Sequence, residues 1–170
     1  MLVLVLFGAC GTDDAPAPDA TASVAILPTT GQAVTGTGVF ERLAGVITLE
    51  LDIANAAPGV HGMHIHQVAD CAMDGMAAGG HWDAGETAGD PDGHGLPDGA
   101  SHVGDLGNIT ISADGTGALT RTNATWTLDG SATDVTGHAI IFHALTDDGS
   151  MPSAGARHGC GIIVPDLDPA

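Results

Sequence analysis

Apolar and polar residues alternate with a period of two in several short stretches of the chain, which is typical of β-strands with one buried face. The clearest case is the segment 46–53 (Val-Ile-Thr-Leu-Glu-Leu-Asp-Ile), in which four aliphatic residues fall on one face and Thr, Glu and Asp on the other. By the same criterion we expect strands at 22–27, 34–41, 46–53, 60–68, 108–112, 117–122, 137–144 and 161–164, with a strand or bridge around 125–128. Short strands separated by turns, without a helical period of useful length, predict an all-β domain: an eight-stranded antiparallel Greek-key barrel or sandwich.

Residues 69–107 interrupt this pattern, because they show almost no apolar periodicity and are rich in Gly, Asp and His. A loop of that length is normally functional or disordered. It carries candidate metal ligands at His81, His94, His102 and Asp105. We therefore expect a long metal-binding loop that a bound ion orders.

The charge of the chain restricts its partners. The 170 residues provide for one domain with its own core. They carry a net charge of −18 and only three Lys or Arg residues. A nucleic-acid binder is excluded, since almost nothing could neutralise phosphates. The balance instead indicates a highly soluble or salt-adapted protein.

The first residues resemble an export signal. An apolar run of the first seven residues precedes Gly-Ala-Cys10, and Leu6–Cys10 resembles a bacterial lipobox. The run is too short to cross a bilayer and lacks a basic start, so we expect the true start to lie upstream. The alternative is a disordered apolar N-terminus. We divide the chain into a signal-peptide remnant (1–10) ending in a lipidated Cys10, a flexible tether (11–20), a folded domain (21–165) and a tail (166–170). The predicted location is the periplasm or cell envelope, with the membrane reached only through the lipid.

The cysteines agree with export. Three are present, and lipid on Cys10 leaves Cys71 and Cys160 to form a disulfide in an oxidising compartment. Closing a loop of that length stabilises a fold by roughly 4–5 kcal/mol in the chain-entropy model. The alternative is a pair of buried free thiols.

The nine histidines are the strongest chemical signal. His64 and His66 stand two apart, so on a strand both rings point to one face. With His143, near the end of a distant strand, they could form an all-imidazole site of the kind that suits copper. The imidazoles and the carboxylate of the long loop fit a closed tetrahedral zinc site.

Five segments, in order along residues 21–164, resemble the copper/zinc superoxide dismutase family, whose fold is a β-sandwich. They are His61-Gly-Met-His-Ile-His66, Ala78-Gly-Gly-His81, His102-Val-Gly-Asp-Leu-Gly-Asn108, Gly137-His-Ala-Ile-Ile-Phe-His143 and Gly155-Ala-Arg-His-Gly-Cys-Gly-Ile-Ile163.

The resemblance implies the ligand sets and the activity. Copper would be bound by His64, His66, His81 and His143, and zinc by His81, His94, His102 and Asp105. Asp147 would link ligands of the two metals, Arg157 would hold the superoxide anion, and His81 would bridge the metals and carry a proton. The implied reaction converts superoxide to dioxygen and hydrogen peroxide by cycling of the bound copper, with zinc as structural and electrostatic partner. A homodimer is compatible with the family.

Other interpretations remain at this stage. A non-catalytic periplasmic copper- and zinc-binding lipoprotein would need the ligands but not Arg157, whereas a purely structural sandwich would leave the ligands unexplained. His61 and His138 fit packing roles better than ligand roles, and His158 fits either the mouth of the site or the surface. The segment 148–157 is short and the chain has no lysine, so we expect weak electrostatic steering of superoxide.

Overall fold

The computed structural model describes residues 18–84, 93–97 and 101–166, which form eight strands and one short 3₁₀ helix. The elements are β1 (Ala20–Pro28), β2 (Thr35–Leu43), β3 (Val46–Ala54), β4 (Gly59–His66), η1 (Met76–Ala78), β5 (Asp105–Ile111), β6 (Gly117–Asn123), β7 (Ala139–His143) and β8 (Arg157–Pro165). Cys10, most of the tether and residues 167–170 lie outside the described ranges. In the described part, no helix is long and apolar enough to cross a membrane.

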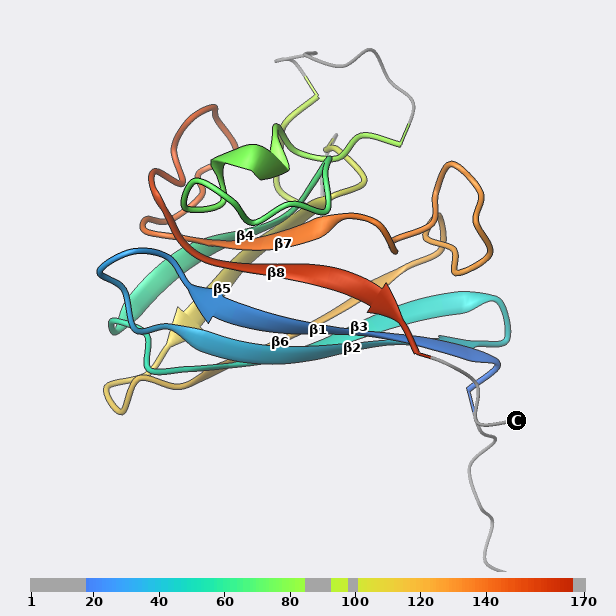
Figure 1. Ribbon diagram of the computed structural model, residues 1–170, viewed down its shortest axis with the longest axis horizontal. Helices are drawn as coiled ribbons and strands as arrows, with labels where there is room; N and C mark the ends of the chain where they lie inside the picture. The colour runs from blue at the N-terminus through green and yellow to red at the C-terminus, as the bar shows by residue number, and fades with distance from the viewer. Residues whose placement is uncertain (1–17, 85–92, 98–100, 167–170) are drawn as a thin grey trace, which may run out of the picture.

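The strands form one sheet in the order β5-β4-β7-β8-β1-β2-β3-β6, and all neighbours pair antiparallel. The two end strands, β5 and β6, follow one another in the chain across the turn Ser112–Thr116, which is closed by a hydrogen bond from Ser112 N to Thr116 O of 2.8 Å. Arg121 in β6 also donates from Nε to the carbonyl of Leu106 in β5. The sheet is therefore a nearly closed barrel, which confirms the predicted eight-stranded Greek-key fold (Figure 1).

A single large apolar cluster fills the barrel. In β3 the four residues of the predicted apolar face are buried, whereas Glu50 and Asp52 are exposed. The aromatic side chains Phe40 and Trp126 meet edge to face in this core, with ring centroids 5.6 Å apart. Burial of this aliphatic and aromatic surface is the main driving force for the fold.

The structure corrects several predicted boundaries. β5 begins at Asp105 instead of residue 108, β8 at Arg157 instead of residue 161, and β4 ends at His66 instead of residue 68. The residues added at these starts are Asp105–Gly107 and Arg157–Cys160, which show no apolar alternation. They extend the strands because β4 and β7 pair with them. The segment 125–128 contributes an isolated parallel bridge between Thr127 and Asp134.

Loops cover the outer face of one side of the barrel. In Figure 1 the green loop with η1 lies over β4 and β7, whereas β2, β3 and β6 on the opposite side have no such cover. A second, small apolar cluster packs Ala78 and Cys71 of this loop against Ala139, Ile141 and Cys160. As a result β7 is buried along its whole length, on both faces.

Candidate metal centre

Four imidazoles meet between the outer face of β4 and the loops that cover it. His64 and His66 come from β4, His143 from the end of β7, and His81 from the long loop. Their ligand atoms all lie within 4.8 Å of one another, and His64, His66 and His143 are buried. The structure thus brings together the set that the resemblance assigns to copper.

Backbone pairing positions His81 beside this strand. His81 and His66 form an isolated antiparallel bridge. The next residue, Trp82, donates from its backbone N to the carbonyl of Ile65 at 2.9 Å, and its indole is almost fully buried. The loop is therefore tied to β4 at the point where a bridging ligand is needed.

A second group consists of His64, His81, His94 and Asp105, whose ligand atoms also lie within 4.8 Å of one another. Asp105 Oδ1 is 2.8 Å from His81 Nδ1 and 3.2 Å from His94 Nδ1. His64 and His81 both belong to the two groups, and an imidazole ring has two nitrogens.

His102, the fourth predicted zinc ligand, lies next to this second group but is not a member of it. Its Nδ1 is 3.4 Å from Asp105 Oδ2, and its backbone N donates to the same oxygen at 2.9 Å. Asp105 thus connects three of the loop histidines.

Asp147 connects the two groups through its carboxylate. Its Oδ2 accepts from His64 Nε2 at 2.7 Å, and its Oδ1 is 3.0 Å from His94 Nε2. Asn108 holds this residue through two backbone contacts of 2.8 Å: its Nδ2 donates to the carbonyl of Asp147, and its Oδ1 accepts from the amide of Asp147. We did not assign this role to Asn108 from the sequence, although its place at the end of the segment 102–108 was the available signal.

Burial keeps His64, His66 and His143 neutral. Desolvation lowers the pKa of His64 to about 4 and that of His143 to about 3, and it lowers the pKa of His66 well below the usual value. Burial by itself would raise the pKa of Asp147, but hydrogen bonds, first of all from His64, hold it well below its usual range. At neutral pH these three imidazoles are therefore neutral and Asp147 is an anion; a neutral imidazole is the form that binds a metal.

The hydrogen bonds also decide which ring nitrogens are available. His66 Nδ1 lies 3.0 Å from the carbonyl of Gly79, and His143 Nδ1 lies 3.2 Å from that of Gly155. A carbonyl only accepts, so both Nδ1 atoms carry the hydrogen and both Nε2 atoms present lone pairs. These two Nε2 atoms face one another at 3.4 Å, an arrangement that a cation between them would stabilise.

His64 leads to the same conclusion. Its Nε2 donates to Asp147, and its buried Nδ1 has no hydrogen-bond partner within the described residues. A buried polar atom without a partner is costly, and such a lone pair among three other imidazoles is suited to a metal ion. The two groups therefore offer the donor atoms that a bound metal ion needs.

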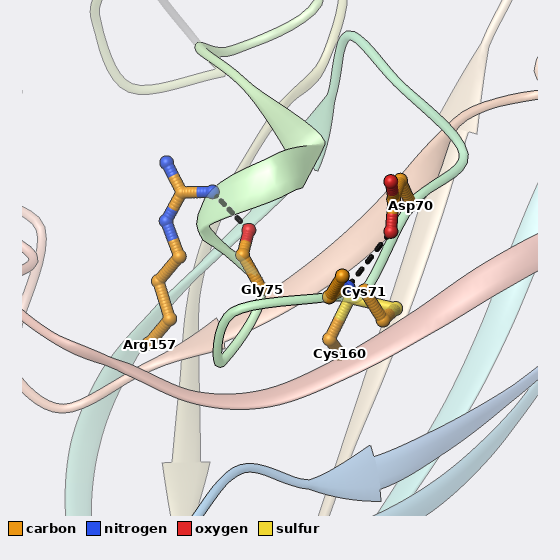
Figure 2. The surroundings of a disulfide bond; sticks show 6 residues. Asp70, Cys71, Gly75, Arg157 and Cys160 are labelled. Carbon is orange, nitrogen blue, oxygen red and sulfur yellow. Dashed lines mark hydrogen bonds between the residues drawn. A yellow bond between two sulfur atoms is a disulfide. The ribbon is translucent and has the colours of Figure 1, made fainter.

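Arg157 is held at the edge of this site. Its Nη1 and Nη2 donate to the carbonyls of Gly75 and Gly79, which flank η1. Figure 2 shows that the disulfide between Cys71 and Cys160 ties the same loop to β8, the strand that begins with Arg157. The predicted disulfide is confirmed, and it fixes the loop that orients the guanidinium.

A cavity of about 500 Å³ leads to the ligands. His64, His66, His81, His143 and Arg157 line it. His158 also lines it, in agreement with a place at the mouth.

The remaining histidines have packing contacts. His61 contacts the carbonyls of His143 and Ala57 and stacks on Phe142, with ring centroids 4.7 Å apart. His138 contacts the carbonyl of Gln67 and stacks on Trp82 at 4.3 Å. His61 and His138 belong to neither ligand group, as the sequence predicts.

Comparison with known proteins agrees with this geometry. Residues 34–163 match the family model of copper/zinc superoxide dismutase. A protein of Brassica juncea named superoxide dismutase [Cu-Zn] 2 is 34% identical over 153 residues, covering 82% of this chain and 95% of its own. The crystal structure of the clock protein EA4 shares the fold, with a TM-score of 0.70 and 24% identity over 89% of this chain and 97% of its own. The family match spans most of the folded domain, and the chain belongs to the copper/zinc superoxide dismutase family.

Proposed function

We propose that the protein is an active superoxide dismutase that converts two superoxide anions and two protons to dioxygen and hydrogen peroxide. The observation that carries this proposal is a pair of ligand groups that share His64 and His81. The histidines of both groups line one cavity together with the half-buried Arg157. Copper would be held by His64, His66, His81 and His143, and zinc by His81, His94, His102 and Asp105. When bound, copper supplies the change of oxidation state and zinc supplies fixed positive charge beside His81.

The residues of the chain would position the anion and one proton. Arg157 keeps a positive charge in the cavity, where it would bind superoxide, because two backbone carbonyls fix its guanidinium there. His81 would take up a proton on one ring nitrogen during the first half of the reaction and donate it to the second superoxide. Asp147 would keep His64 and His94 oriented through its two oxygens.

The test is superoxide decay with the full chain loaded with copper and zinc, measured together with metal content. Arg157→Ala should lower the rate by about tenfold or more, because the local attraction of the anion is lost. Its metal content should stay unchanged. Arg42→Ala, on β2 and away from the cavity, is the matched control and should keep the wild-type rate.

The competing function, metal sequestration by a non-catalytic lipoprotein, predicts the opposite result. A fully loaded wild-type protein without superoxide decay would support sequestration. The variant His81→Ala tests the ligand assignment whichever function holds. Loss of a shared ligand should reduce the affinities for copper and for zinc together. Retention of both metals at wild-type affinity would contradict the bridging role.

We also propose that the protein is exported and carries a lipid on Cys10. The disulfide supports this, since such bonds persist in oxidising compartments, and it leaves Cys10 as the third cysteine of the chain. Metabolic labelling of an expressing bacterium with a radioactive fatty acid should mark the wild-type protein but not its Cys10→Ser variant. Equal labelling of both proteins would rule the anchor out.

A further inference from the structure

The methionines of the described residues divide sharply by exposure. Met63 is fully buried in the barrel core, whereas Met73, Met76 and Met151 are 73%, 60% and 51% exposed. Packing in the core therefore accounts for a methionine at position 63 but not for the three exposed methionines. An exposed thioether is available as a soft, polarisable ligand.

Two of the exposed methionines lie on the cavity that leads to the imidazoles. Met76 begins η1, and Met151 belongs to the loop between β7 and β8. Both line this cavity, as does His158, while His66 and His143 line it among the candidate copper ligands. Met73 sits beside Met76, since the backbone N of Met76 donates to the carbonyl of Met73 at 3.1 Å.

Besides the guanidinium of Arg157, the cavity carries a carboxylate that can attract a cation from solvent. Asp74 lines it, and its Oδ1 accepts from the backbone N of Thr30 at 2.9 Å. That hydrogen bond lowers the pKa of Asp74, so the carboxylate stays charged. The chain as a whole carries −18, and such a field attracts cations towards the surface.

We propose that the thioethers of Met76 and Met151, with the imidazole of His158, form an entry site that binds monovalent copper and passes it to the buried imidazoles. The inference rests on the proposed copper site and adds a second, outer site to it. Thioethers select Cu(I) over harder cations. Two thioethers and one imidazole bind more weakly than four buried imidazoles, so the ion moves inward. The transfer exchanges ligands only, and the copper keeps its oxidation state.

The outer site can be tested with Ag(I), a soft monovalent ion that does not change its oxidation state. The full chain is first loaded with zinc at both inner sites, and the methionine methyl groups are labelled with ¹³C for NMR. Addition of Ag(I) should shift the methyl signals of Met76 and Met151 and leave that of buried Met63 in place. The double variant Met76→Leu/Met151→Leu should lower the Ag(I) affinity by about tenfold or more, because Leu keeps the volume but not the sulfur. Unshifted Met76 and Met151 signals, or an unchanged affinity in the double variant, would overturn the proposal.

The role in entry is tested by the rate at which the metal-free protein takes Cu(I) from a bicinchoninate complex without oxygen. The double variant should load about tenfold more slowly than wild type and reach the same final copper content. Its loading with Cu(II) from a glycine complex should be unchanged, and Met63→Leu serves as the matched control. Equal Cu(I) rates in wild type and double variant, or equal slowing of Cu(I) and Cu(II), would contradict an entry site.

These results are separable from the proposed activity. A wild-type protein that loads Cu(I) about tenfold faster than the double variant but does not remove superoxide would refute the dismutase and support the entry site. An active protein whose double variant loads at the wild-type rate would refute the entry site alone.

Discussion

β3 and β4 are strands of similar length in one barrel, yet they are buried in different ways. β3 buries one face of aliphatic side chains and exposes the other, so its sequence alternates apolar and polar residues. β4 is buried on both faces from His61 to His66. Met63 and Ile65 enter the core, while His64 and His66 point the other way into the candidate metal site.

The difference shows that two kinds of interaction stabilise the same sheet. On the β3 side, transfer of apolar surface from water holds the structure together. On the β4 side, the second buried face is polar. Its desolvation cost is offset by hydrogen bonds that the imidazoles donate to Asp147 and to backbone carbonyls and, in the proposed enzyme, by metal ions. The first side should therefore respond to changes in volume, and the second to changes in protonation and ligand chemistry.

The largest expected effect is that of acid, which should destabilise the protein through the buried histidines of the β4 side and not through the apolar β3 side. In the metal-free protein His64 and His143 have pKa values of about 4 and about 3, against 6.5 for a histidine outside the fold. As the pH falls below 6.5, the unfolded chain binds protons that the folded chain does not, so the free energy of unfolding decreases until these lower values are reached. For His64 alone the difference corresponds to about 3 kcal/mol.

Urea denaturation of the metal-free protein between neutral pH and pH 4 measures this loss. A His143→Gln variant, which cannot titrate, should lose less stability over the same range. Equal stability of the wild-type protein at both ends of the range would show that these histidines are not held neutral by the fold.

A core substitution should affect the β3 side without reaching the metal chemistry. Leu49→Ala removes a fully buried side chain from the barrel and should destabilise the protein by about 2–5 kcal/mol. Val46→Ala, on the exposed face of the same strand, should change stability by less than about 0.5 kcal/mol. In the folded fraction of both variants the copper and zinc affinities should equal those of wild type. A metal affinity that falls with stability would mean that the two sides are not independent.

Asp147→Asn should affect the β4 side through ligand orientation. Loss of the carboxylate that joins His64 and His94 should weaken metal binding by about 10- to 100-fold, measured by competition with a chelator. Asp148→Asn is the neighbouring control, since Asp148 is exposed and bonds to Ser150. Equal losses in the two variants would point to bulk charge as the cause.

The smallest effect is expected from salt. The chain has no lysine and a net charge of −18, so attraction of superoxide depends on Arg157 within the cavity, and charges farther away are screened over about 8 Å at physiological ionic strength. We expect kcat/KM of the loaded enzyme to change by less than about threefold between low and physiological salt. A steep fall with ionic strength would demonstrate long-range steering that this charge distribution does not predict.

The two sides also differ in how far they could be predicted from sequence. The alternation in 46–53 predicts β3 almost to the residue, because one-sided burial imposes a period of two. The starts of β5 at Asp105 and β8 at Arg157 were missed, since their first residues pair with β4 and β7 without any apolar pattern. Asn108 belongs to a recognisable segment, but its hydrogen bonds to Asp147 depend on the contact between β5 and the loop after β7, whose two residues are 39 positions apart.

The sequence by itself determined the all-β class, the candidate ligands and their family. One-sided burial of strands and clusters of histidines both produce patterns that can be recognised in short stretches of sequence. The sequence also indicated Cys71 and Cys160 as a pair. The resemblance also implied the shared His81 and the link through Asp147. Only the tertiary structure showed that His64 lies in both ligand groups as well, that His102 lies beside them, and that Met76 and Met151 share a cavity with His66 and His143. These relations join residues far apart in sequence, and no local preference encodes them. They arise when the barrel closes and its loops fold over β4 and β7.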